Sequence, residues 1–183
     1  MSKIINTPLT DEVINELKAG DRVLLNGIIY TGRDAAHKRL VELIRKGERL
    51  PMDIENQTIY HVGPCPAKPG QVIGSAGPTT SGRMDAYAPL LMKHGLKGMI
   101  GKGLRNKEVV DAIRKYNCVY FAAIGGAGAL LAEAIKESEV IAFPDLGAEA
   151  IYKLRVENFP VTVVIDREGN DLYRIGKEKY KIV

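Results

Sequence analysis

The sequence predicts an α/β domain with a mixed sheet, and two observations support this prediction. Runs of branched apolar residues alternate with amphipathic segments along the 183 residues, which is typical of strands and helices packed in layers. A proline-rich stretch at residues 48–71 and an expected hairpin near the C-terminus interrupt this alternation, so a purely parallel sheet is not expected. The hydrophobic content of 45% and the lack of a repeat or linker favour a single domain over residues 1–183.

The first third of the chain is expected to form a helix, a strand and a second helix. These elements fall at residues 9–20, 22–32 and 34–47. Apolar residues recur at helical spacing in the first element, and the strand is rich in branched residues and ends at Gly32. Asp34 is expected to be the N-cap of the second helix, and Gly47 is expected to end it.

The same alternation continues to the C-terminus. Strands are expected at residues 58–63, 71–77, 96–101 and 118–126, and helices at residues 83–95, 106–117 and 127–138. Pro89 is expected either to kink the helix at residues 83–95 or to mark its true first turn. Residues 139–147 and a hairpin over residues 161–175, which turns at Glu168 to Asn170, complete the chain.

Composition and charge exclude several classes of function. No apolar run approaches the roughly 20 residues of a membrane helix, and the first residues lack the pattern of a signal peptide. The net charge is +4, but opposite charges are interleaved and there is no Trp, so a nucleic-acid partner is not expected. Cys65 and Cys118 are far apart, which fits a reducing compartment. We therefore expect a cytoplasmic protein with no membrane partner, whose charge suits a small anion.

Three cations follow glycines at junctions between expected elements. Arg33 lies in TGRD, Arg83 in SGRMD and Lys102 in GKG. Each is expected just beyond the carboxyl end of a strand, the edge of an open α/β sheet where ligands bind. A cation near a helix N-terminus is unfavourable unless an anion is present, and the planar fork of arginine suits a carboxylate or phosphate. The three cations together predict an anion site, while each one alone also fits an ordinary surface position.

The stretch GPTTSGR adds hydroxyl groups beside Arg83. Thr79, Thr80 and Ser81 are suited to hydrogen bonding of the same anion or to proton transfer, and equally to turn building and helix capping. A threonine hydroxyl is a very weak base, so proton transfer would need a charged neighbour or a partner group.

The rest of the sequence offers no complete catalytic set. His37, His61 and His94 lack the spacing of metal ligands, and two cysteines cannot hold an iron–sulfur cluster alone. The stretch IGGAG does not match the G-x-G-x-x-G pattern of a dinucleotide site. Its glycines favour close packing between a strand and a helix. The alternative is that its backbone amides line the anion site. No motif frames a serine nucleophile. The sequence thus contains anion-binding residues but no complete catalytic set, which predicts half of an active site.

Four stretches of the chain resemble a known family. They are GPTTSGRMDAYAPLL, KGMIGKG, FAAIGGAGALLAEAIK and FPDLGAEAIYKLRVENFPVTVVIDREGND. Together they are similar to the β subunit or C-terminal domain of class I (iron–sulfur) fumarate hydratase and to the related β subunit of L-tartrate dehydratase. The resemblance covers nearly the whole chain and implies a domain of the swivelling β/β/α type with a mixed sheet.

The resemblance also implies a hydro-lyase reaction and a partner. The reaction is the reversible hydration of fumarate to (S)-malate, a step of the tricarboxylic acid cycle. The partner is an α subunit whose three cysteines hold a [4Fe-4S] cluster with an open iron as Lewis acid, in a dimer of αβ pairs. Carried over residue by residue, Arg33 and Arg83 would bind the dicarboxylate with support from Lys102 and Thr80. Thr79 would be the proposed base.

Three alternatives stay open at this stage. The first is dehydration of L-tartrate or of another 2-hydroxy dicarboxylate by the same kind of site. The second is a non-catalytic anion-binding module that regulates or scaffolds a dehydratase. The third is an independent nucleotide-binding domain, which only the IGGAG stretch favours.

Overall fold

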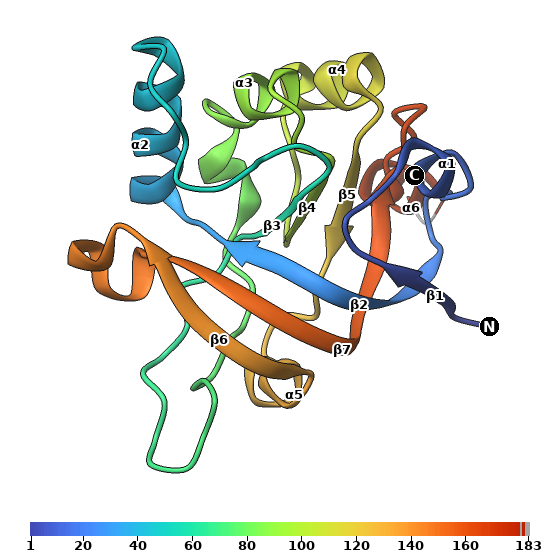
Figure 1. Ribbon diagram of the computed structural model, residues 1–183. Coiled ribbons are helices and arrows are strands. Elements are labelled where there is room, and N and C mark those ends of the chain that lie inside the picture. The colour runs from blue at the N-terminus through green and yellow to red at the C-terminus, as the bar shows by residue number, and fades with distance from the viewer. Residues whose placement is uncertain (180, 182–183) are drawn as a thin grey trace.

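Seven strands of the described residues form one mixed sheet, in the order β1-β2-β3-β4-β5-β7-β6 (Figure 1). The computed structural model describes residues 1–179 and 181, so residues 180, 182 and 183 of the predicted domain lie outside the described residues. The strands are β1 (Lys3–Asn6), β2 (Arg22–Thr31), β3 (Thr58–Tyr60), β4 (Gly98–Gly101), β5 (Val119–Ala122), β6 (Ile135–Ala142) and β7 (Ile151–Ile165). β1 to β5 pair in parallel, whereas β7 is antiparallel to β2, β5 and β6. The predicted α/β class and mixed sheet are confirmed.

The long strand β7 closes the sheet on itself. It pairs with β5 at one end and with β2 along most of its length, so that β2, β3, β4, β5 and β7 form a closed, barrel-like ring. β2 carries a register shift between Leu25 and Gly27, as strands that bend around a barrel commonly do. β6 extends the sheet beyond this ring, in front of the ring in Figure 1.

Six α-helices and two 3₁₀ helices occur among the described residues. They are α1 (Asp11–Asn15), α2 (Asp34–Arg45), α3 (Ala88–Lys93), α4 (Lys107–Tyr116), α5 (Gly128–Glu133), α6 (Leu172–Lys179), η1 (Ser81–Met84) and η2 (Pro144–Glu149). α2, α3 and α4 lie together on one side of the sheet (Figure 1). No helix in the described part of the chain is both long enough and apolar enough to cross a membrane.

Both faces of the central strands are buried, which divides the apolar core into two clusters. Along β4 and β5, Ile100, Val119 and Phe121 point into the ring of strands. Met99 and Tyr120 alternate with them and pack under α2, α3 and α4. Because successive side chains of a strand point to opposite faces, the same strands contribute to one cluster inside the ring and to another beneath the helices.

Helix ends agree with the sequence in part. Asn106 is the N-cap of α4, since its side chain accepts a hydrogen bond from the Val109 amide at 2.9 Å. Pro89 lies in the first turn of α3, the second of its two expected roles. The prediction that Asp34 caps α2 is wrong, because Asp34 is the first helical residue and Arg33 is the N-cap, without a side-chain capping bond.

The expected strand at residues 71–77 is absent, because its backbone groups bond to other loops. The Gly74 amide donates to Cys65 O at 3.1 Å, and Ser75 O accepts from the Cys65 amide at 2.9 Å. The Ala76 amide donates to Gly128 O, and Ala76 O accepts from the Tyr60 hydroxyl at 2.5 Å. The segment is therefore a loop that packs on α5.

Two other elements differ in extent or type from the prediction. The expected helix at residues 127–138 ends at Glu133, and Ile135–Ala142 forms β6, because this segment gains a full ladder of pairing with β7. The expected helix at residues 9–20 is shortened to Asp11–Asn15.

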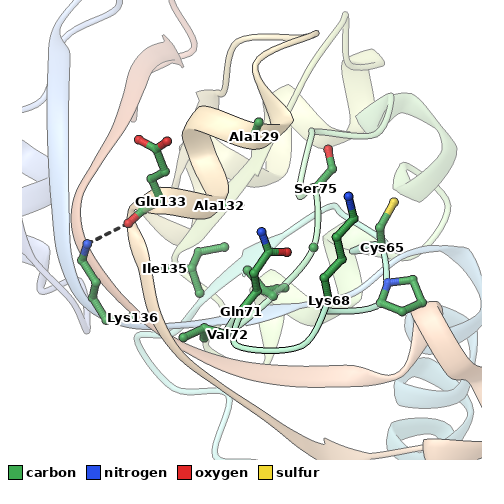
Figure 2. Close-up of a pocket in the computed structure, with 13 residues that line it drawn as sticks. Cys65, Lys68, Gln71, Val72, Ser75, Ala129, Ala132, Glu133, Ile135 and Lys136 are labelled. Atoms are coloured by element: carbon green, nitrogen blue, oxygen red, sulfur yellow. Dashed lines mark hydrogen bonds between the residues drawn. The ribbon is translucent and has the colours of Figure 1, made fainter.

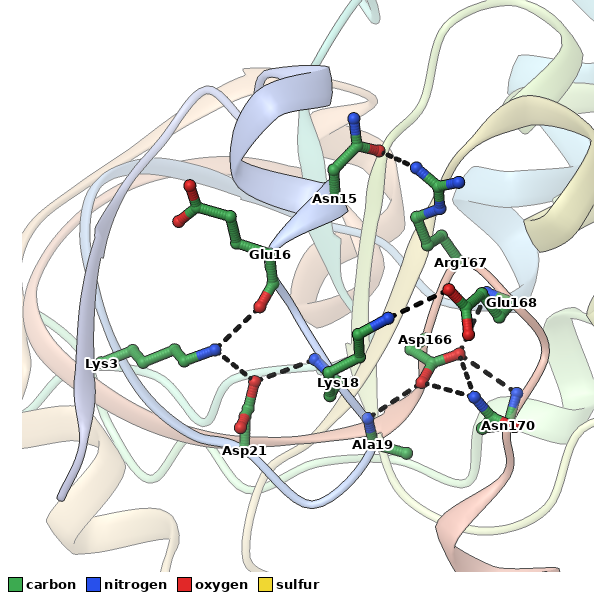
Figure 3. A network of polar contacts seen from close by, with 10 residues as sticks. All are labelled: Lys3, Asn15, Glu16, Lys18, Ala19, Asp21, Asp166, Arg167, Glu168 and Asn170. Carbon is green, nitrogen blue, oxygen red and sulfur yellow. Dashed lines mark hydrogen bonds and ion pairs between the residues drawn. The ribbon is translucent and has the colours of Figure 1, made fainter.

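The predicted C-terminal hairpin is also wrong in its second arm, which is helix α6 after a single bridge between Ile165 and Asp171. The buried Asp166 organises the turn instead, as Figure 3 shows. Its carboxylate accepts from the amides of Glu168 at 3.0 Å, Asn170 at 3.1 Å and Ala19 at 3.1 Å. Once these amides bond to Asp166, they are not available for a second strand.

Candidate active site

The predicted cations lie at the edge where the parallel strands β2 to β5 end. Arg33 follows β2, His61 follows β3, Lys102 follows β4, and the stretch from Ala123 to Gly126 follows β5. Because these strands are parallel, their carboxyl ends meet at one edge, the usual location of a ligand site in an α/β sheet.

The loop carrying the two predicted threonines crosses this edge. The Thr79 amide donates to His61 O at 2.7 Å, and the Ser81 amide donates to Lys102 O at 2.9 Å. Thr80 lies between them and pairs with Lys102 in a parallel bridge. The structure therefore brings Thr79, Thr80 and Lys102 together, with Thr79 half-buried and the other two side chains exposed.

Arg33 packs over the backbone of Gly63. A Cβ built on Gly63 would lie 2.6 Å from Arg33 Nη1, so a side chain there would displace the guanidinium from this position. Arg33 Nε is buried without a hydrogen-bond partner, 3.8 Å from Glu149 Oε1. The side chain keeps 26% of its surface exposed, so part of the guanidinium faces solvent at the edge.

Arg83 also lies at this edge of the sheet, but in a different local structure from the predicted one. It lies in the 3₁₀ helix η1 and does not directly follow a strand. Its guanidinium pairs with the carboxylate of Asp34, the residue next to Arg33, and its side chain is 55% exposed. The two arginines are therefore brought close through Asp34, and an incoming carboxylate would compete with Asp34 for Arg83.

Lys102 lies beside the glycine-rich turn after β5. A Cβ built on Gly125 would be 3.8 Å from Lys102 Nζ, an ordinary contact distance that places the ammonium group against this turn. Within the described part of the chain, no carboxylate forms an ion pair with Lys102. It is a cation available to an external anion.

A buried ion pair holds η1 against the segment after Lys102. Arg105 Nε donates to Asp85 Oδ1 at 2.6 Å, and the Asn106 amide donates to Asp85 Oδ2 at 2.7 Å. The Arg105 side chain is fully buried, and its guanidinium stacks 4.8 Å from the centre of the Tyr120 ring. Asp85 is thus a structural residue that ties η1 to the start of α4.

Two buried histidines lie beneath the edge. The rings of His37 and His61 are 5.2 Å apart in an edge-on arrangement, and neither ring nitrogen Nε2 has a hydrogen-bond partner. His37 Nδ1 donates to Arg33 O at 2.8 Å. Burial lowers the pKa of His37 to about 4 and holds the pKa of His61 well below its usual range. Both rings are therefore neutral near pH 7.

These depressed pKa values predict a loss of stability at acid pH. The unfolded chain binds protons at His37 and His61 below about pH 6.5, whereas the folded chain does not bind one at His37 until about pH 4. The free energy of unfolding should therefore be highest above about pH 6.5 and fall between about pH 6.5 and 4. The contribution of His37 alone to this fall is about 3 kcal/mol. Urea unfolding at several pH values measures this slope, and His37→Gln should reduce it.

A separate cavity of about 720 Å³ lies away from this edge, between the loop at residues 65–75 and the segment from α5 to β6 (Figure 2). Its lining includes Cys65, Lys68 and Lys136 but none of the predicted site residues. Cys65 is exposed on this loop, while burial raises the pKa of the Cys118 thiol to about 12. The described residues contain no cluster of histidine, cysteine, aspartate and glutamate that could hold a metal ion.

Two contributors to the edge, His61 and Glu149, were not predicted from the sequence. The His61 ring forms a buried hydrogen bond of 2.8 Å with the predicted hydroxyl residue Ser81, and Glu149 contacts Arg33 from η2. The position of His61 directly after a strand is a signal that could have drawn attention to it, as it did for Arg33 and Lys102. Glu149 has no comparable signal, because its neighbour is more than a hundred residues away.

Residues 2–176 match the family described as Fumarase C-terminus. The class I anaerobic fumarate hydratase of Escherichia coli K12 is 42% identical over 174 residues, which cover 93% of this chain and 32% of that enzyme. Fumarate hydratase 2 of Leishmania major is 43% identical over 162 residues, covering 87% of this chain and 28% of that enzyme. The chain thus spans about a third of the length of these fumarate hydratases.

One relative has a different extent. A Methanocaldococcus jannaschii protein assigned as the beta subunit of an L(+)-tartrate dehydratase is 41% identical over 180 residues. The match covers 94% of this chain and 92% of that protein.

Proposed function

The chain belongs to the fumarase C-terminal family, and on this premise we propose that it is the β subunit of a class I fumarate hydratase. With a separate α subunit it would catalyse the reversible hydration of fumarate to (S)-malate. The observation that carries this proposal is the placement of Arg33, Arg83, Lys102 and Thr79 at one edge of the sheet.

The cations suit a four-carbon dicarboxylate. The guanidinium group of each arginine can hold one carboxylate by two parallel hydrogen bonds, and Lys102 adds a third positive charge. Removal of a proton from the carbon beside a carboxylate builds negative charge on that carboxylate. Fixed cations at this position stabilise the transition state more than the ground state, which is the condition for faster turnover.

Thr79 is the proposed base for this proton. Its amide is held by His61 O at 2.7 Å, so its place on the edge is fixed by the backbone. No group among the described residues makes its hydroxyl strongly basic, because no carboxylate or histidine among them hydrogen-bonds to the Thr79 side chain. We therefore propose that a group of the α subunit activates Thr79, as the weak basicity of an alcohol requires.

The cysteines of this chain do not fit an iron–sulfur cluster. Cys118 is a buried, protonated thiol, Cys65 is exposed, and the described residues offer no third ligand near either. The proposal accordingly assigns the [4Fe-4S] cluster to the α subunit. The residues of this chain would bind and orient the substrate and move one proton.

The relative assigned as a beta subunit supports a two-chain enzyme. That Methanocaldococcus jannaschii protein is 41% identical to this chain over 180 residues. A subunit of this kind would act with a partner that carries the rest of the catalytic site. A dimer of αβ pairs remains our expectation for the assembly.

A second candidate is the β subunit of an L-tartrate dehydratase. The observation that favours it is the 41% identity over 180 residues with the relative assigned to that function. Both substrates are four-carbon dicarboxylates, so the cations would serve either one, and the hydroxyl groups on the substrate would decide between them.

The test is an anaerobic assay with fumarate and with L-tartrate, on this chain alone and after mixing with the iron-loaded α subunit from the same cell. We expect fumarate hydration in the mixture only. Activity with L-tartrate but not with fumarate would change the proposed substrate and leave the proposed site unaffected. If the chains associate but neither substrate reacts, the domain is an anion-binding regulatory module and the proposed roles of Thr79 and Arg83 are wrong.

A further inference from the structure

His61 contacts the threonine loop at both of its ends. Its backbone carbonyl accepts a hydrogen bond from the Thr79 amide at 2.7 Å. Its ring Nδ1 lies 2.8 Å from Ser81 Oγ, in a pair that is fully buried. A single buried residue at the end of β3 thus spans the loop on which Thr79 and Thr80 lie.

The pair is packed so closely that it has few alternative arrangements. A Cβ built on Gly101 would lie 1.8 Å from Ser81 Oγ and 3.0 Å from His61 Nδ1, so the last residue of β4 must be glycine for the pair to form. The charged and titratable groups that face His61 are His37 and Arg105, and neither hydrogen-bonds to its ring.

The direction of the hydrogen bonds follows from the groups involved. The His61 ring has one hydrogen-bond partner among the described residues, Ser81 Oγ at Nδ1, and its Nε2 has none. A buried N–H group without an acceptor is rarer than a buried acceptor without a donor, so the ring proton of His61 is assigned to Nδ1, which donates to Ser81 Oγ. The ring nitrogen Nε2 then carries a lone pair and no proton, which agrees with its buried position without a partner.

We propose that His61, with its proton on Nδ1, and Ser81 are positioning residues that fix Thr79 and Lys102 for the reaction of the proposed function. The hydrogen bonds run from the His61 carbonyl to the Thr79 amide, from the His61 ring to Ser81 Oγ, and from the Ser81 amide to Lys102 O. They join the ends of β3 and β4 to the threonine loop beneath the anion site. Neither residue contacts the substrate.

Two substitutions at His61 separate this role from a general loss of packing. In His61→Asn the side-chain amide nitrogen takes nearly the place of Nδ1, so the donor to Ser81 is kept. In His61→Gln the amide reaches towards the place of Nε2, so this donor is lost while a polar side chain of similar size remains. Both keep the backbone carbonyl that holds Thr79.

In the complex with the α subunit, we expect His61→Gln to lower kcat by about 10- to 100-fold with a smaller change in KM, because misplacement by about 1 Å has effects of this size. His61→Asn should stay within about threefold of the unchanged protein. Equal kcat values for the two variants would overturn the proposal.

Two measurements on the full chain do not depend on activity. The ¹⁵N resonances of His61 should show a protonated Nδ1 and an unprotonated Nε2 at pH 7. Amide hydrogen exchange at Thr79 and Ser81 should become at least about tenfold faster in His61→Gln than in His61→Asn. A proton on Nε2, or equal exchange in the two variants, would contradict the positioning role even if fumarate and tartrate both prove to be wrong substrates. An inactive unchanged complex would overturn the proposed function alone.

Discussion

Replacing Thr79 by alanine is expected to lower kcat for fumarate hydration by about 10²- to 10⁴-fold, the range that a positioned acid–base group contributes. The substitution removes the hydroxyl from a loop whose backbone is held independently, by the Thr79 amide to His61 O and by the Ser81 amide to Lys102 O. The loop should therefore keep its path, and KM should change less than kcat. Steady-state kinetics of the complex with the α subunit measure both values.

Thr79→Ser is the matched control, because it keeps a hydroxyl at the same position and removes only a methyl group. It should retain much more activity than the alanine variant, while cluster content and association with the α subunit are the same in both. A kcat near normal in Thr79→Ala would show that another group removes the proton.

Part of the site could be predicted from the sequence because it is encoded locally. Arg33 and Lys102 come directly after runs of strand-forming residues, so their place at the carboxyl edge follows once the strands are parallel. Arg83 was expected at that edge for the wrong reason. It arrives there through a loop that is held by hydrogen bonds to Cys65 and to the distant Gly128, and these bonds leave no local signal in the sequence.

The errors in the fold have a similar origin. Residues 127–138 include many good helix formers, yet Ile135–Ala142 pairs with β7, whose partner residues come after it in the chain. Local propensity is weak against a full ladder of hydrogen bonds, so tertiary pairing decides. The turn at Asp166 differs for the opposite reason, because a single buried carboxylate collects the amides that a second strand would need.

The support beneath η1 leads to a second large effect, on stability. In Asp85→Ala the fully buried guanidinium of Arg105 would lose its carboxylate, and the Asn106 amide would lose its acceptor. Removal of one partner from a buried ion pair leaves an uncompensated charge and costs about 3–5 kcal/mol. We expect the free energy of unfolding in urea to fall by this amount, and fumarate turnover to fall as well because η1 carries Arg83.

Two further variants identify the cause of this loss. Asp145→Ala breaks the exposed pair with Arg39 and should leave the unfolding midpoint nearly unchanged, since solvent screens such pairs. The double variant Asp85→Ala with Arg105→Met should recover much of the lost stability, because it removes the unpaired charge and keeps an apolar side chain against Tyr120. A double variant as unstable as Asp85→Ala would mean that the hydrogen bond to the Asn106 amide, and not the buried charge, holds η1 in place. If the double variant instead recovers stability but not turnover, Asp85 has two separate roles. One is to neutralise Arg105, and the other is to fix the 3₁₀ turn that presents Arg83 to the anion site.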